Sequence, residues 1–333
     1  MSRTTVSFVL NRVPGMRISE ATRLRVTEAA RRLNYHPDAT ARHMATGRTQ
    51  LIGFVLRQRQ DQALADRCLP QVLLGLNRAS SAQGYRVLFE AISPEDGDGG
   101  LPRLIQERYV DGIVLSGPRS DDQELLQIHA EGAKVVLMGQ LPGTAIAFVD
   151  VDNVGGARLA TLHLVGLGYR RIALITNASP AYTASVDRMT GYRLALEAAG
   201  IGYDASLVRY GAFTPESGRA AMDELLSLTP RPDAAFVASD AVALGALQAI
   251  RERRLQVPVD VALVGFDDVP LAEFLDPPLT TVRIPGYGLG WGAAELLVRL
   301  ISAEEEVRNP AVILETEMVV RESCGARLNR TAQ

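Results

Sequence analysis

Several polar side chains come directly after apolar runs of the sequence, where a parallel sheet would bring them together. Ser116 and Ser239 each end such a run, and Asp267 follows another. In open α/β sheets, ligands bind beyond the carboxyl ends of the strands. Arg188 and Phe213, in expected loops, would add a cation and an aromatic face. Together these five residues predict a site for a sugar or a similar polar small molecule.

Each of these residues also has a simpler structural explanation, as part of a turn or as a helix cap. Ser239 and Asp267 precede expected helices, where serine and aspartate commonly cap the first turn. Arg188 and Asp267 would alternatively form a structural ion pair. If they instead face an empty cleft, we expect both to be solvated and their replacement to leave stability almost unchanged. The residues alone leave these alternatives open.

The sequence contains few patterns typical of an enzyme. It has no Gly-x-Ser-x-Gly, no His-Glu-x-x-His and no phosphate-binding loop. The glycine-rich run 286–292 lacks the strand before it and the acid after it that a dinucleotide site needs, so we interpret it as the start of a helix. The histidines are dispersed, and Cys68 and Cys324 lack metal-like spacing. We predict no catalytic activity, no metal and no other cofactor.

Short apolar runs alternate with amphipathic stretches from residue 51 onward. Runs that are apolar on both faces suit parallel strands covered by helices on both sides. The predicted strands are 51–56, 85–91, 112–116, 135–139, 172–176, 234–239 and 261–266, and the predicted helices include 69–83, 157–167, 189–199 and 241–253. The pattern occurs twice, over about 51–150 and 151–280. This predicts an α/β fold of two doubly wound parallel-sheet lobes with a cleft between them.

Composition and charge limit the class of protein further. With 47% hydrophobic and 22% charged residues, the chain is not mostly disordered, and no apolar stretch reaches the roughly 20 residues of a membrane span. The net charge of −3 is divided unevenly. Residues 1–50 carry nine arginines and three acids, a net +6, which leaves −9 for the rest. A small basic segment on an acidic body is typical of a nucleic-acid-binding module, although a solvated basic surface gives the same pattern.

The basic segment contains two clear helix patterns. Ser2 is placed to cap a helix that ends near Leu10, and Ser19 is placed to cap a second helix. Apolar spacing predicts that the second helix buries Val26, Ala29, Ala30 and Leu33. Pro37 suits the first turn of a short third helix at 38–45.

At these residues the sequence resembles the lac-repressor/galactose-repressor (LacI/GalR) family of bacterial transcription regulators. The resemblance is carried by Ser-Arg-Thr-Thr-Val-Ser-Phe-Val-Leu-Asn at 2–11, Leu-Asn-Tyr-His-Pro at 33–37, Asp-Arg-Met-Thr-Gly-Tyr at 187–192, Ala-Ser-Asp at 238–240 and Val-Gly-Phe-Asp-Asp at 264–268. It covers nearly the whole chain. It implies residues 1–47 as a helix-turn-helix with a hinge helix, and 48–333 as an effector-binding and dimerisation domain whose segment 281–333 completes both lobes, as in type I periplasmic-binding-protein folds.

The resemblance implies roles for individual residues of the basic segment. Arg3, Thr4 and Phe8 match base-reading positions, where arginine pairs with guanine and a ring contacts a thymine methyl. Met44 matches the apolar wedge that enters the minor groove, with Arg42 near phosphate. Positions that contact phosphate or support the helix are matched by Ser2, Thr5, Ser7 and Asn11.

In the body, the resemblance supports the small-molecule site. Arg188, Phe213 and Asp267 match effector-contacting positions. Ser239 stands where many sugar-responsive members carry asparagine, so the effector need not be a common hexose. Ser116 is a further match, from the first lobe.

One feature departs from the family pattern. Members place another helix before this recognition helix, ending in Ala-Gly-Val-Ser, and Met1 stands in place of that valine. We expect the helix-turn-helix to be truncated, either through a misassigned start codon or through a genuine loss, and its apolar face to lack a partner.

These observations predict a cytoplasmic transcriptional repressor. As a homodimer it would bind a roughly palindromic operator DNA under control of a sugar or sugar derivative, with no membrane association. The alternatives are a ligand-binding sensor whose truncated helix-turn-helix no longer binds DNA specifically, and a periplasmic sugar carrier, which the lack of a signal-peptide pattern disfavours.

Overall fold

The computed structural model describes residues 2–10, 15–35, 47–93, 95, 100–302 and 311–326. The chain divides into two compact units, Met1–Gln50 and Leu51–Gln333. The predicted hinge helix at 38–45 lies outside the described residues, and so do Asn11, Arg42 and Met44.

The N-terminal unit contains two described helices, α1 (Arg3–Leu10) and α2 (Glu20–Arg32). Both start at the predicted serines. The Ser2 hydroxyl oxygen accepts a hydrogen bond from the Thr5 N–H at 3.1 Å, and the Ser19 hydroxyl oxygen accepts one from the Thr22 N–H at 3.4 Å. Each serine therefore satisfies a backbone donor that the helix itself leaves without a partner.

The apolar face of this unit is only partly covered by described residues. Val9 and Val26 are buried between the helices, but the prediction for Leu33 is wrong: this side chain is 72% exposed. Leu33 is the C-cap residue of α2. Together with Val6 and Leu10 it lines an open groove of about 770 Å³. Within the described ranges, no side chain fills this groove.

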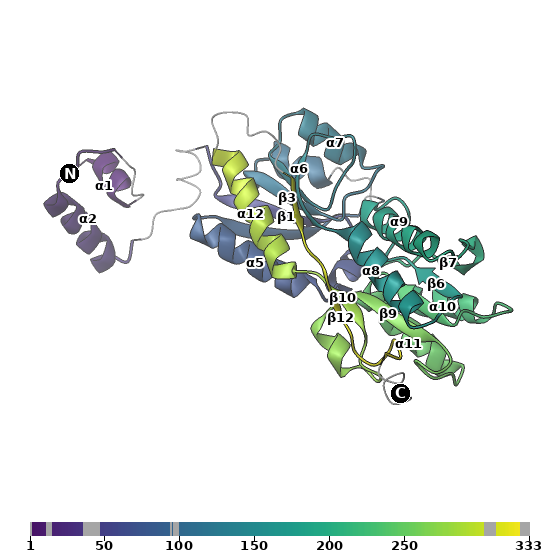
Figure 1. Ribbon diagram of the computed structural model, residues 1–333. Helices are drawn as coiled ribbons and strands as arrows, with labels where there is room; N and C mark the ends of the chain where they lie inside the picture. The colour runs from purple at the N-terminus through teal and green to yellow at the C-terminus, as the bar shows by residue number, and fades with distance from the viewer. Residues whose placement is uncertain are drawn as a thin grey trace. The chain divides into compact units, whose positions relative to one another are not determined.

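The larger unit consists of two lobes, each built on a six-stranded sheet (Figure 1). The sheet of lobe 1 has the order β11-β5-β4-β3-β1-β2 and is parallel throughout. Its strands are β1 (Leu51–Leu56), β2 (Arg86–Ala91), β3 (Gly112–Ser116), β4 (Val135–Met138), β5 (Ala147–Val151) and β11 (Ala311–Leu314).

The sheet of lobe 2 has the order β12-β10-β9-β8-β6-β7. It is parallel except for β12, which pairs antiparallel with β10. Its strands are β6 (Ile172–Ile175), β7 (Val208–Arg209), β8 (Ala234–Val237), β9 (Ala262–Asp267), β10 (Thr281–Arg283) and β12 (Glu317–Val319).

Helices cover both faces of each sheet. In lobe 1 these are α4 (Gln60–Ala65), α5 (Leu69–Ala82), α6 (Gly100–Gln106), α7 (Gln123–Ala130) and α12 (Gly286–Ser302). In lobe 2 they are α8 (Asn153–Gly166), α9 (Thr183–Ala198), α10 (Pro215–Leu226), α11 (Asp240–Glu252) and the short 3₁₀ helices Ala205–Leu207 and Pro270–Phe274. Each lobe has one apolar core on each side of its sheet.

Helix α12 begins at the glycine-rich run, as predicted, and packs along α5 (Figure 1). A side chain at Gly290 would collide with the backbone carbonyl of Val72 in α5, and one at Gly75 would collide with that of Tyr287. The glycines of this run therefore allow two helix backbones to approach closely, and they form no nucleotide loop.

Three chain segments cross between the lobes. They lie between β5 and α8, between β10 and α12, and between β11 and β12. The C-terminal part of the chain thus supplies β10 and β12 to lobe 2, and α12 and β11 to lobe 1. All seven predicted strands are present within two residues of their expected bounds. The expected α/β fold with two lobes is confirmed.

Candidate ligand-binding site

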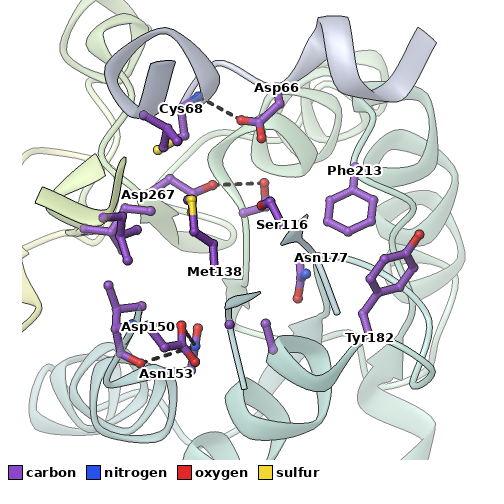
Figure 2. Close-up of a pocket in the computed structure, with 18 of the residues that line it drawn as sticks. Asp66, Cys68, Ser116, Met138, Asp150, Asn153, Asn177, Tyr182, Phe213 and Asp267 are labelled. Atoms are coloured by element: carbon purple, nitrogen blue, oxygen red, sulfur yellow. Dashed lines mark hydrogen bonds between the residues drawn. The ribbon is translucent and has the colours of Figure 1, made fainter. Parts of the chain in front are cut away.

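A pocket between the two lobes is lined by all five residues that the sequence singled out. Ser116, Phe213 and Asp267 are labelled in Figure 2. Ser116 ends β3 of lobe 1. Phe213 precedes α10, Ser239 precedes α11 and Asp267 ends β9, all in lobe 2. The cavity has a volume of about 150 Å³. Parallel sheets bring these positions together because their strands end at the same edge.

Arg188 lies in a different element from the one expected. The sequence predicts a loop here, but Arg188 belongs to the second turn of α9, because this helix starts at Thr183 rather than at 189. Its guanidinium donates through Nε to Asn153 Oδ1 at 2.8 Å and through Nη1 to the Ala238 carbonyl at 2.6 Å. It also lies 3.8 Å from the centre of the Phe266 ring. The charge is therefore fixed in one position before any ligand arrives.

Asp267 faces Arg188 and Ser239 across the pocket. Its carboxylate lies 3.8 Å from Arg188 Nη1, and it accepts a hydrogen bond from the Ser239 hydroxyl at 3.2 Å. Burial raises the pKa of Asp267 to about 7, although the Arg188 charge opposes that rise. Asp240, fully buried beside it, has its pKa raised by the same loss of hydration and by the Asp267 charge.

Two expectations about these residues are wrong. Arg188 and Asp267 are not solvated in the empty cleft: only 9% and 15% of their side chains are exposed, and they already form an ion pair. The capping explanation also fails, because Ser239 makes no side-chain cap to α11 and Asp267 is the last residue of a strand. The Asp240 carboxylate accepts a hydrogen bond from the Val269 N–H at 3.0 Å, directly before the 3₁₀ helix Pro270–Phe274.

The backbone is strained at two of the predicted ligand residues. Phe213 has a φ of 62° and Asp267 a φ of 122°, both in a region that favours glycine. Such conformations are costly, and they cluster at binding sites, where the surrounding structure holds them. Here the Phe213 N–H donates to the Asn177 carbonyl at 2.8 Å, which holds the aromatic residue against the pocket.

An aromatic wall forms one side of the pocket. The rings of Tyr182 and Phe213 meet edge to face with their centres 5.0 Å apart (Figure 2). The Tyr182 hydroxyl donates to the Arg57 carbonyl of lobe 1 at 2.7 Å, and the Arg119 guanidinium lies 5.1 Å from its ring centre. This wall therefore belongs to lobe 2 but is attached to lobe 1.

Several polar residues of the pocket are not among those predicted from the sequence. Asp150 is the last but one residue of β5, a strand that was not predicted, and it accepts a hydrogen bond from the Asn153 side chain at 3.1 Å. Asp66 accepts one from the Cys68 N–H at 2.8 Å. Burial raises the pKa of Asp66, and it raises that of Asp150 to about 6. Asn177 comes directly after the predicted strand 172–176. The criterion that selected Ser116, a polar residue at the end of an apolar run, would therefore also have selected Asn177.

The candidate DNA-contacting face lies on α1. Thr4 and Ser7 are exposed there, and Phe8 is half-buried. Arg3 is the first residue of this helix. Ser2 and Thr5 are joined through their hydroxyls at 2.9 Å, which serves the start of the helix. The spacing of Thr4 and Phe8 puts them on one face of a helix.

In the described part of the chain, no group of three or more histidine, cysteine or acidic residues could hold a metal ion. The described part of the chain also contains no helix that is long and apolar enough to span a membrane.

The fold and the pocket define a two-lobed ligand-binding protein with a helical N-terminal module. The family model for bacterial regulatory proteins of the lacI family matches residues 1–38, and that for the periplasmic binding protein-like domain matches residues 161–324. The regulator CelR of Thermobifida fusca is 38% identical over 97% of this chain and 95% of its own. The chain therefore belongs to the lacI family, whose members are transcription regulators and not enzymes.

Two solved structures extend the comparison. A complex of the transcriptional regulator CelR with cellobiose has 36% identity and a TM-score of 0.79, covering 97% of this chain and 96% of its own. The lac repressor dimer bound to operator and the anti-inducer ONPF has 27% identity and a TM-score of 0.83 over the same shares.

Proposed function

We propose that this protein is a cytoplasmic, DNA-binding transcriptional repressor that acts as a homodimer on operator DNA. A neutral sugar in the pocket between the lobes controls its affinity for the operator. The effector residues we propose are Ser116, Arg188, Phe213, Ser239 and Asp267.

The charge of the pocket carries the proposal for a neutral ligand. Three carboxyl groups line it, those of Asp66, Asp150 and Asp267, against the single guanidinium of Arg188. That guanidinium is already bonded to Asn153 and to the Ala238 carbonyl, and it faces Asp267. A phosphate group would meet more repulsion than attraction here. Sugar hydroxyls instead donate to carboxylates, and the ring of Phe213 offers a surface for an apolar sugar face.

Contacts across the cleft offer a route from ligand to DNA. Besides the bond from Tyr182 to the Arg57 carbonyl, the Ser120 N–H donates to the Ala181 carbonyl at 2.9 Å, and the Gln62 side chain donates to the Ala212 carbonyl at 3.2 Å. A ligand that binds between these points changes the balance between open and closed lobes. The ligand can change the affinity for DNA by no more than the ratio of its own affinities for the open and the closed form.

Titration calorimetry with a set of sugars tests the ligand class. Cellobiose and other neutral mono- and disaccharides are compared with glucose 6-phosphate. We expect a neutral sugar to bind at least tenfold more tightly than the phosphate ester, and to change the gel-shift affinity for DNA upstream of the gene. Tighter binding of the phosphate ester would refute the proposal.

A second function has one observation in its favour. The groove lined by Val6, Leu10 and Leu33 leaves the apolar face of the N-terminal unit open within the described residues. Such an open groove agrees with a ligand-binding sensor whose N-terminal unit binds DNA only weakly. The test compares the 333-residue chain with one that carries an added family-like helix before Ser2. If the added helix fills the groove, specific affinity rises by about 4 kcal/mol or more; equal and tight binding by both chains would rule this function out.

A further inference from the structure

Two buried side-chain oxygens in the pocket have no hydrogen-bond partner. Among the described residues, four buried side-chain nitrogen or oxygen atoms lack one, and two of these, Gln58 Oε1 and Asn177 Oδ1, belong to residues that line the pocket. Both residues are only 5% exposed. Buried polar groups are nearly always bonded, so each exception needs an explanation.

The two residues occupy equivalent places in the two lobes. Gln58 lies two residues past the end of β1, and Asn177 lies two residues past the end of β6. In its own sheet each strand is the fifth of six, with β2 or β7 as the edge strand beside it. The internal repeat of the fold therefore places one unsatisfied amide oxygen in each half of the pocket.

The backbone on either side of these residues is held in place. The Arg57 N–H donates to the Ser116 carbonyl at 3.0 Å, and the Arg57 carbonyl accepts the Tyr182 hydroxyl, so the position before Gln58 is fixed from both lobes. The Asn177 carbonyl accepts the Phe213 N–H. Fixed groups that lack only their partner are pre-organised for a ligand.

We infer that Gln58 and Asn177 are specificity-determining residues that accept one hydroxyl each from the same effector, one from each lobe. This assignment rests on the proposed function, because it concerns the same pocket. An oxygen acceptor is satisfied only by a donor, so the effector carries hydroxyl groups on two sides. A ligand held in this way ties lobe 1 to lobe 2, and an analogue that lacks either hydroxyl leaves a buried oxygen without a partner.

The test uses the full chain and cellobiose, together with the other neutral sugars, as probes in titration calorimetry. Gln58→Met and Asn177→Leu remove each amide at nearly constant volume. We expect each to weaken sugar binding about tenfold to a hundredfold, the cost of a lost bond to a buried group. Gln127→Met and Asn77→Leu, which change exposed helix residues outside the pocket, serve as matched controls and should bind like the wild type.

Thermal melting without ligand separates binding from structure. Because an apolar side chain removes an unsatisfied buried group, the melting temperature of either variant should stay the same or rise. Monodeoxy sugars complete the design: the deoxy position that weakens wild-type binding should have no further effect in the variant that lacks its partner.

The results that overturn the inference are distinct. If wild-type protein binds a neutral sugar and the variants bind it equally well, Gln58 and Asn177 are not ligand residues, while the proposed function stands. A variant that loses affinity together with thermal stability has lost a structural group, which also refutes the assignment. If the wild-type protein binds no neutral sugar, the proposed function fails and this inference fails with it.

Discussion

Replacing Asp267 by asparagine should stabilise the ligand-free protein and weaken its effector binding at the same time. The carboxylate is buried next to a second buried acid, Asp240, and its pKa lies near 7 instead of 3.8. Asparagine has the same shape and no charge, so it resembles the protonated form of Asp267, which burial favours. The variant removes a destabilising charge and a ligand contact together.

The magnitude follows from the pKa. The unfolded chain loses this proton near pH 4 and the folded chain near pH 7, so wild-type stability falls as pH rises through that window. At about 1.4 kcal/mol for each factor of ten, the full penalty above pH 7 is about 4 kcal/mol. Solvent reaches 15% of the side chain and screens part of this, so we expect a gain of about 2–4 kcal/mol at pH 8 and almost none at pH 4.

Denaturant unfolding at pH 4 and 8, with calorimetric titration of the sugar, measures both effects. Loss of a charged hydrogen bond to the ligand should weaken binding about tenfold to a hundredfold. Asp268→Asn is the matched control: this neighbour is bonded at 2.7 Å to both Arg283 and Arg321 and does not line the pocket. It should lower stability and leave affinity unchanged. A less stable Asp267→Asn protein at pH 8, or one that binds sugar like the wild type, would refute the reasoning.

Three further outcomes are expected. Arg188→Met should lower the free energy of unfolding by about 3–5 kcal/mol, because it leaves buried acceptors without their cation; a stability equal to the wild type in denaturant melts would contradict this. Tyr182→Phe removes the bond to the Arg57 carbonyl, about 1 kcal/mol, and should enlarge the ligand-free protein in small-angle scattering, whereas an unchanged radius of gyration would show that this bond does not hold the lobes. Met44→Ala should reduce DNA bending in circular-permutation gels with sugar affinity intact; an unchanged bend angle would remove Met44 from the DNA contact.

The fold was predictable wherever strands are buried on both faces. Such strands form uninterrupted apolar runs, and six of them were found near their true bounds. The seventh predicted strand, β2, is an edge strand in which exposed and half-buried residues alternate. The strand β5 was missed because Asp150 interrupts its apolar pattern, and β7 and β10 were missed because two or three residues carry no period. Strand β12 was also missed. It pairs antiparallel at a sheet edge, where one exposed face prevents an uninterrupted apolar run.

The site was predictable in position but not in electrostatics. Residues past strand ends gather at one edge of a sheet, which is why Ser116, Ser239 and Asp267 line one pocket. The ion pair from Arg188 to Asp267 depends on where α9 starts, six residues before the predicted helix. Desolvation depends on the whole surroundings of a group, and no local pattern in the sequence encodes it.

The exchange of C-terminal elements between the lobes has a consequence for biosynthesis. Strand β5 reaches residue 151, yet its outer partner β11 begins only at residue 311. The apolar face of lobe 1 that α12 covers together with α5 also stays uncovered until α12 (Gly286–Ser302) has been synthesised. While the ribosome synthesises the intervening residues, lobe 1 exposes an unpaired sheet edge and part of its core.

An emerging chain in this state is prone to aggregation and is a substrate for chaperones. Neither lobe is completed until about residue 320 has left the exit tunnel, so the two lobes finish folding almost together. A premature stop codon or a frameshift before residue 286 would therefore disable the first lobe as well as the second, because it removes α12, β11 and β12 together.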